Sequence, residues 1–98
     1  MNIQAMMKQA QKLQKDMLKE KQAIDEQIFV GKSSIVKIEM KGNKEIVNVK
    51  IDTDSINKDE IEVVEDMIVV AINDAMKQID KVTEEKMGKY TQGLPGLF

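Results

Sequence analysis

Four lysines near the N-terminus are spaced so that they would form one row on a helix. Lys8, Lys12, Lys15 and Lys19 follow one another at intervals of four, three and four residues. At 3.6 residues per turn they fall within about 60° of one another, in a row roughly 16 Å long. Such ammonium groups could contact successive phosphates of DNA. A solvated helix face would show the same pattern, so both interpretations stay open at this point.

The residue types that the chain lacks restrict the chemistry further. The 98 residues include no histidine, cysteine, tryptophan or arginine, so all fifteen basic residues are lysines. Histidine is the usual acid–base group near neutral pH, and cysteine supplies thiolates and zinc ligands. The serines have no histidine to activate them, and no glycine-rich phosphate loop is present. We therefore expect no enzymatic activity, cofactor, metal ion or small-molecule substrate.

The acidic residues between positions 52 and 66 do not fit a calcium loop. Counted from Asp52 as the first ligand, the glycine position is occupied by Asn57 and the bidentate glutamate position by Val63. Acids at the start of a helix are favoured by the helix dipole. We therefore interpret this cluster as a solvated helix N-terminus.

The formal net charge of −2 argues against a nucleic-acid ligand, but the charges are unevenly distributed. Residues 1–50 hold ten lysines against six acids, and residues 51–98 hold five lysines against eleven acids. This asymmetry indicates a charged partner for the basic half. Lysines contact phosphates without reading bases, so a lysine site predicts salt-sensitive, sequence-tolerant binding to duplex DNA. Four contacts in each chain of a dimer would give a log–log salt slope no steeper than about −7.

Residues 2–28 are predicted to form one long amphipathic helix that carries these lysines. Neither glycine nor proline interrupts the segment, and its apolar residues recur at spacings of three, four and seven: Ile3, Met6, Ala10, Leu13, Met17, Ile24 and Ile28. The resulting apolar stripe is narrow, which is typical of a helix that pairs with another helix. We expect this helix to project from the body of the protein.

The middle of the chain changes to the alternating pattern of strands. Residues 34–40 and 45–51 are rich in β-branched residues, and residues 41–44 between them contain the glycine and asparagine of a hairpin turn. Residues 27–32 are expected to add a short edge strand, although this segment competes with the end of the first helix. The alternation places two apolar sets on one face each: Val36, Ile38 and Met40, and Val47, Val49 and Ile51.

A second long helix is predicted to begin at a capping box and to carry two apolar stripes. Asn57 and Glu60 form the box, and the helix is expected to stop at Gly88, followed by an irregular tail over residues 88–98. A helix that is apolar on two sides needs two partners, which we predict to be the sheet and a second subunit. An intrachain helix pair is the alternative. The expected core or dimer contacts are Val63, Met67, Ile68, Val70 and Ile72.

Nearly the whole chain resembles the YbaB/EbfC family. The resemblance rests on the basic N-terminal helix and on several segments, of which the Asn-Asp-Ala and Gly-Leu-Pro-Gly-Leu-Phe stretches are the most distinctive. These segments are residues 35–42, 45–52, 65–66, 71–75, 85–89 and 93–98. The resemblance implies one α+β domain over residues 1–98, an α-β-β-β-α protomer with a small antiparallel sheet and two long helices, and a tweezer-like homodimer. It also implies a cytoplasmic, nucleoid-associated protein that binds double-stranded DNA with broad specificity.

The lysines that would contact phosphate are an inference from spacing, because the family has no shared base-contacting motif to transfer. The four lysines of the first helix are the main candidates, and weaker candidates lie near the helix ends: Lys21, Lys86 and Lys89. Two other functions remain open. An interaction adaptor would use Met6, Met7 and Met17 with the Leu97-Phe98 tail. A membrane-surface helix is disfavoured because the first helix has no tryptophan or phenylalanine.

Overall fold

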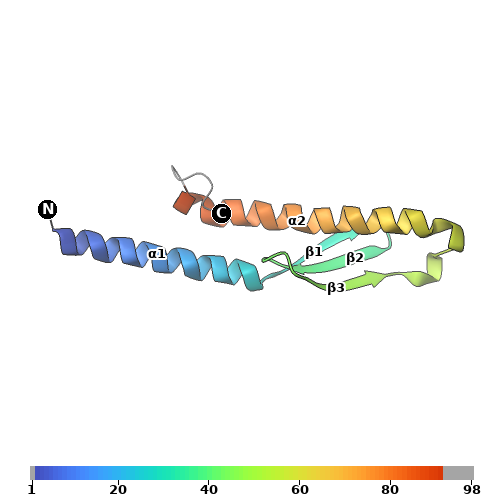
Figure 1. Cartoon of the computed structure of the whole chain (residues 1–98), viewed down its shortest axis with the longest axis horizontal. Coiled ribbons are helices and arrows are strands. Elements are labelled where there is room, and N and C mark those ends of the chain that lie inside the picture. Colours follow the sequence, from blue (N-terminus) through green and yellow to red (C-terminus); the bar gives the residue numbers. More distant parts are fainter. Residues whose placement is uncertain (1, 92–98) are drawn as a thin grey trace.

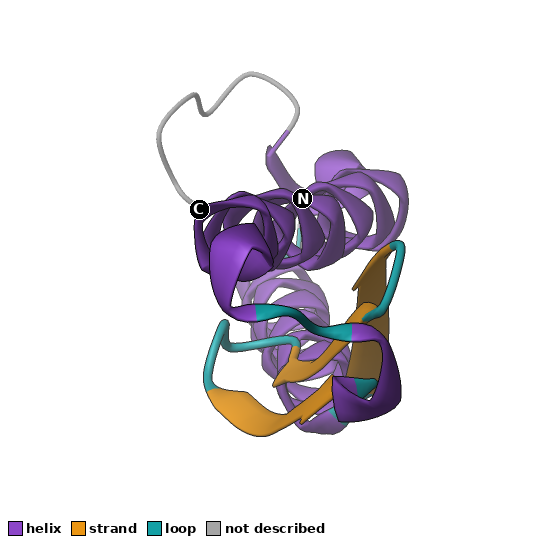
Figure 2. Cartoon of the chain, turned by 90° about the vertical axis from the view of Figure 1, so that its right-hand side faces the viewer, coloured by secondary structure: helices purple, strands orange, loops and turns teal. Residues whose placement is uncertain are grey.

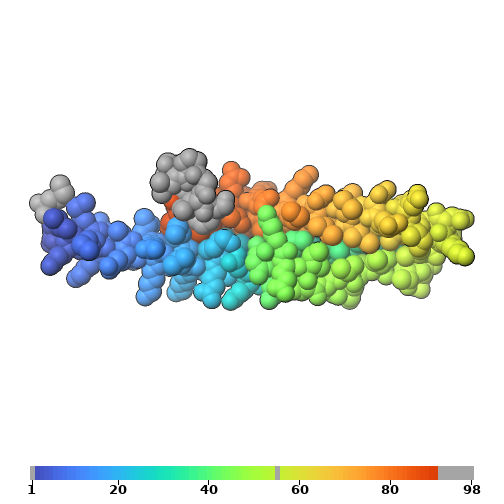
Figure 3. Space-filling model, viewed as in Figure 1, coloured from blue at the N-terminus to red at the C-terminus, as the bar shows by residue number. Residues whose placement is uncertain are grey.

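The computed structural model describes residues 2–91 and confirms the predicted α-β-β-β-α order of an α+β protein. The chain is elongated, with extents of 72 × 21 × 14 Å (Figures 1 and 3). Two short 3₁₀ turns, Thr53–Ser55 and Lys58–Glu60, precede the last helix. The elements are α1 (Ile3–Glu26), β1 (Ile28–Ser33), β2 (Val36–Lys41), β3 (Ile46–Ile51) and α2 (Ile61–Thr91).

Helix α1 is capped at its N-terminus and exposed along most of its length. The side-chain oxygen of Asn2 accepts hydrogen bonds from the backbone N–H groups of Gln4 and Ala5, at 3.1 and 3.3 Å. Such a cap satisfies donors that have no partner within the helix. Ile24 near the C-terminal end is buried, whereas most other side chains of α1 face solvent. The N-terminal turns extend beyond the end of α2, so α1 projects as expected (Figure 1).

The three strands form an antiparallel sheet in the order β1-β2-β3, and α2 packs against β1 and β2 on one of its faces (Figure 2). Val36, Ile38 and Met40 of β2 point into this layer and are buried. They meet Ala71 and Ala75, the small residues of α2 that allow close approach. The expected face of β2 and the expected edge strand are thus both confirmed.

The predicted face of β3 is wrong at Val47. Met40 pairs with Ile46 while Glu39 pairs with Asn48, so Val47 is an extra residue in a β-bulge. A bulge interrupts the strict alternation of a strand, and single-strand periodicity cannot reveal it. Val49 lies opposite Ile38, on the side of the sheet that α2 covers, yet it is 47% exposed. Edge strand β3 therefore keeps an uncovered apolar surface.

Helix α2 starts at the predicted capping box but does not end where the sequence suggested. The Asn57 N–H donates to the Glu60 carboxylate at 3.4 Å, and one 3₁₀ turn leads into the α-helix. The helix passes through Gly88 and continues to Thr91, so residues 88–91 are not irregular. A glycine inside a helix costs only about 1 kcal/mol, and a lysine in the last turn favours helix continuation. Residues 92–98, the rest of the expected tail, lie outside the described residues.

Two glycines allow backbone segments to approach more closely than a side chain would permit. A Cβ atom at Gly31 of β1 would lie 2.0 Å from the Ala71 carbonyl oxygen of α2. One at Gly42 in the hairpin turn would lie 1.8 Å from the Ile24 carbonyl oxygen. The Gly42 N–H also donates to the Gln27 carbonyl at 2.9 Å. Gly31 therefore brings α2 onto the sheet, and Gly42 fixes the base of α1 against the hairpin.

The free edge of β1 is capped by side chains of α2. Asp74 accepts a hydrogen bond from the Lys32 N–H at 3.0 Å, and the Gln78 amide donates to the Val30 carbonyl at 2.8 Å. Gln78 also donates to Asp74 at 3.3 Å, so the two side chains act together. Covering an edge in this way prevents pairing with a foreign strand.

Candidate nucleic-acid interface

The four row lysines lie on α1 as the spacing predicted. Lys8, Lys12, Lys15 and Lys19 are all exposed. At about 100° per residue they face roughly away from Ile24, the residue that anchors α1 to the body. The row thus points to solvent from a projecting helix.

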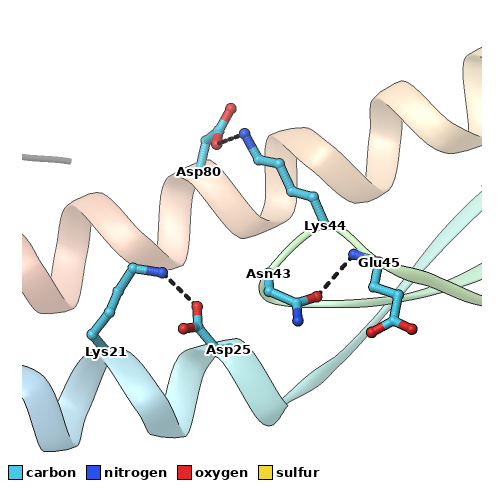
Figure 4. A network of polar contacts seen from close by, with 6 residues as sticks. All are labelled: Lys21, Asp25, Asn43, Lys44, Glu45 and Asp80. Atoms are coloured by element: carbon cyan, nitrogen blue, oxygen red, sulfur yellow. Dashed lines mark hydrogen bonds and ion pairs between the residues drawn. The ribbon is translucent and has the colours of Figure 1, made fainter.

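Ion pairs within residues 2–91 engage other lysines and leave the row unpaired. Lys21 pairs with Asp25 at the base of α1, and Lys44 of the hairpin turn reaches Asp80 at 3.2 Å (Figure 4). Lys89 pairs with Glu20 at 3.2 Å. The row lysines therefore keep their charge available for an external anion.

Two of the weaker candidates, Lys21 and Lys89, each contact a carboxylate of the same chain. Lys21 is half-buried and bonded to Asp25 one turn later. Lys89 bridges α2 to Glu20 of α1 and lies 5.0 Å from the ring centroid of Tyr90. The hydrogen bond to Glu20 and the attraction of its charge raise the pKa of Lys89 above its ordinary value. The i, i+4 spacing of Lys21 and Asp25 is visible in the sequence. Spacing could not show the Lys89 contact, because it joins segments 69 residues apart.

The groove between α1 and α2 has a mixed charge. Glu20 and Glu85 line it together with Lys86 and Lys89. A phosphate entering this groove would meet carboxylates as well as ammonium groups, which weakens its attraction. Lys86 is exposed at the rim. The outer face of α1 is therefore the more favourable place for a polyanion.

The residues expected as core or dimer contacts fall into two groups on α2. Met67, Ile68 and Ile72 pack against the core between α2 and the sheet. Val63 and Val70 are about half exposed, at 51% and 54%. The second apolar stripe thus remains partly uncovered in the single chain.

Three further lysines, which the sequence pattern did not single out, meet on the sheet. Lys32 of β1 pairs with Lys37 of β2, and Lys37 pairs with Lys50 of β3. Their neighbours Val36 and Ile38 face α2, so the three lysines face the opposite side. We call them the sheet lysine triplet. Their adjacency depends on two strand registers, so the only signal in the sequence was a lysine at one outward position of each strand.

Two further features, a metal-holding group and a membrane-spanning helix, are absent from residues 2–91. Residues 2–91 contain no group of three or more acidic side chains placed to hold a metal ion. Over the same residues, neither helix is long and apolar enough to cross a membrane.

Comparison with known proteins supports the DNA-binding interpretation. The sequence model of the YbaB/EbfC DNA-binding family matches residues 1–94. A nucleoid-associated protein of Lactococcus lactis subsp. cremoris (strain MG1363) is 47% identical over 97 residues, covering 97% of this chain and 98% of that protein. A nucleoid-associated protein of Ligilactobacillus salivarius (strain UCC118) is 39% identical, covering 99% of this chain and 95% of the relative.

The fold is shared with a solved structure of low sequence identity. The crystal structure of the uncharacterized protein HP0035 from Helicobacter pylori superimposes with a TM-score of 0.74 at 17% identity, covering 92% of this chain and 97% of that one. This match concerns the fold alone. The family model and the relatives extend along the same α-β-β-β-α chain that presents the lysine row. The chain therefore belongs to the YbaB/EbfC DNA-binding family.

Proposed function

We propose that this protein is a non-enzymatic, nucleoid-associated protein that binds duplex DNA through lysine–phosphate contacts along α1. The observation that carries the proposal is the exposed row of Lys8, Lys12, Lys15 and Lys19, unpaired within residues 2–91 and directed away from the body. Family membership supplies the class of ligand. Lysine alone, without arginine, positions a protein on the phosphate backbone without reading bases, so we expect broad sequence tolerance.

The proposal includes a homodimer whose helices extend like the arms of tweezers. Support comes from Val63 and Val70 on α2 and from Ile46 and Val49 on β3, all between 43% and 54% exposed in the single chain. Uncovered apolar side chains at this density favour burial against a second copy. The relatives named as nucleoid-associated support a location on the nucleoid. We expect the protein to act there, in the cytoplasm, on nucleoid organisation and gene expression.

The dimer is tested by sedimentation velocity on two single-residue variants. Val70→Glu places a charge in the second stripe and should shift the protein toward monomer. Val69→Glu makes the same change at a residue that is 57% exposed and lies about 100° round the helix, so it should leave the dimer intact. A wild-type protein that sediments as a monomer at all concentrations would refute this part of the proposal.

DNA binding is tested with variants that carry equal charge changes. Fluorescence anisotropy with a labelled mixed-sequence duplex compares the wild type with Lys8→Gln/Lys12→Gln/Lys15→Gln, the row variant. The control, Lys58→Gln/Lys77→Gln/Lys81→Gln, removes three exposed lysines outside the row. At about 50 mM salt we expect the row variant to bind at least a hundredfold more weakly than the wild type, and the control to bind like the wild type. Equal binding by all three proteins would show that the lysine row is only a solvated helix face and would refute its role in DNA binding.

An interaction adaptor is the second candidate, and the exposed apolar side chains of α1 favour it. Met6, Met7, Leu13 and Leu18 are each more than half exposed. Methionine-lined surfaces adapt to varied protein partners. If the wild type fails to bind DNA even at about 50 mM salt, the adaptor function is favoured over DNA binding.

A further inference from the structure

The sheet lysine triplet places three like charges side by side on an open face. Lys32, Lys37 and Lys50 occupy directly paired positions on β1, β2 and β3. Neighbouring strands lie about 4.8 Å apart, so the three Cα atoms span roughly 10 Å. Helix α2 covers the other face of the sheet. The triplet is therefore a compact patch of positive charge on the uncovered side.

This arrangement is unfavourable for the folded chain by itself. Like charges directly opposite each other on paired strands destabilise a sheet. Within residues 2–91 none of the three ammonium groups forms an ion pair. Glu39 shares the outward face and lies diagonal to Lys32 and Lys50, so its single charge can offset only one of the three lysines. A neutral polar residue at Lys37 would serve the fold better, so the triplet is a stability cost of the kind that function explains.

We propose that the sheet lysine triplet is a second phosphate-contacting surface for duplex DNA, separate from the row on α1. This inference rests on the proposed function, since it takes the same ligand class. An anionic backbone passing over the triplet would neutralise the cross-strand repulsion that the free protein carries. Lysines are point charges that contact phosphates and read no bases, so we expect the contact to be to phosphates. The body of the protein then contacts DNA as well as the projecting arm.

The test compares the sheet variant, Lys32→Gln/Lys37→Gln/Lys50→Gln, with the control at Lys58, Lys77 and Lys81. Both lose three positive charges, so a general effect of net charge is the same in each. Anisotropy titrations over a salt series give the slope of log affinity against log salt. We expect the sheet variant to flatten this slope by about 3 per protomer relative to the control. A slope and affinity equal to those of the control would overturn the inference.

The row variant separates this inference from the proposed function. If the row variant loses affinity while the sheet variant binds like the control, only the second surface is refuted. If the wild type fails to bind the duplex, the proposed function and this inference are both overturned. Sedimentation velocity without DNA provides a further check, because a change of oligomeric state in the sheet variant would assign the face to a protein interface and refute the inference.

Stability measurements guard against a trivial loss of binding. Removal of the repulsion predicts that the sheet variant unfolds at a urea concentration equal to or above that of the wild type at low salt. The single change Lys37→Gln at the centre of the triplet should flatten the salt slope by about 1 per protomer. A folded Lys37→Gln protein with an unchanged slope would contradict the proposal even if the triple variant failed to fold.

Discussion

A methyl group added at Gly31 should destabilise the protein far more than its size suggests. The new Cβ atom would lie 2.0 Å from the Ala71 carbonyl oxygen and 2.7 Å from the Ala75 backbone nitrogen. These are backbone atoms of α2, which cannot rotate away as a side chain can. The strand and the helix would have to separate by about 1 Å, loosening the contacts of Phe29 and Met40 with Ala75 and Ile79.

The expected magnitude follows from overpacking data. Inserted methyl groups in well-packed cores typically cost about 1–3 kcal/mol. Because backbone meets backbone at Gly31, we expect Gly31→Ala to reach about 3 kcal/mol, which lowers the melting temperature by roughly 12–24 °C for a domain of this length. Gly88→Ala is the matched control. Within residues 2–91 a Cβ there meets no atom within 4 Å outside its own helix backbone, so the better helix propensity of alanine should stabilise the protein by about 0.5–1 kcal/mol.

Urea unfolding followed by far-UV circular dichroism measures both effects at one protein concentration. The same chemical change should therefore shift the midpoint downward at Gly31 and upward at Gly88. A Gly31→Ala protein within about 0.5 kcal/mol of the wild type would show that β1 and α2 do not approach as closely as described, because surface changes have effects of that size. A loss of stability at Gly88 would refute the continuation of α2 through that residue.

Three smaller predictions concern single contacts. Gln78→Ala removes the hydrogen bond to the Val30 carbonyl, so the free energy of unfolding should fall by about 1 kcal/mol and the uncovered β1 edge should promote association. Urea unfolding and light scattering that both match the wild type would contradict this. Lys89→Gln removes the bond to Glu20. Because that bond raises the folded pKa of Lys89 above 10.5, the stability difference from the wild type should be constant from neutral pH to pH 10.5 and vanish as pH rises through the raised value. A difference that persists at higher pH would exclude that contact as its source. Ile38→Ala leaves a cavity in the core, so the free energy of unfolding measured in urea should fall by about 2–5 kcal/mol. A fall of less than about 1 kcal/mol would show that Ile38 is not part of the core.

The elements with strong local signals were predictable from the sequence. The spacing of apolar residues in α1, the alternation around Ile38 in β2 and the Asn57–Glu60 capping box are each set by a few neighbouring residues. Such patterns reflect helix and strand periods directly. The exposed lysine row was predictable for the same reason, since its four members lie within twelve residues of one helix.

The parts that depend on contacts between distant segments could not be predicted. Glycine commonly terminates helices, so the sequence predicts the end of α2 at Gly88, whereas the helix continues to the turn in which Lys89 reaches Glu20 of α1. The bulge at Val47 is defined only by its pairing with β2. The sheet lysine triplet likewise exists only through the registers of three strands, because Lys32 and Lys50 are eighteen residues apart.

The central claim is that the lysine row on α1 binds DNA through its charge. The most direct measurement is the salt dependence of duplex binding by the wild type and by Lys8→Gln/Lys12→Gln/Lys15→Gln. Log affinity should fall linearly with log salt, and the row variant should flatten that line by about 3 per protomer while the Lys58/Lys77/Lys81 control keeps the wild-type slope. A row variant with the affinity and slope of the wild type would contradict the claim.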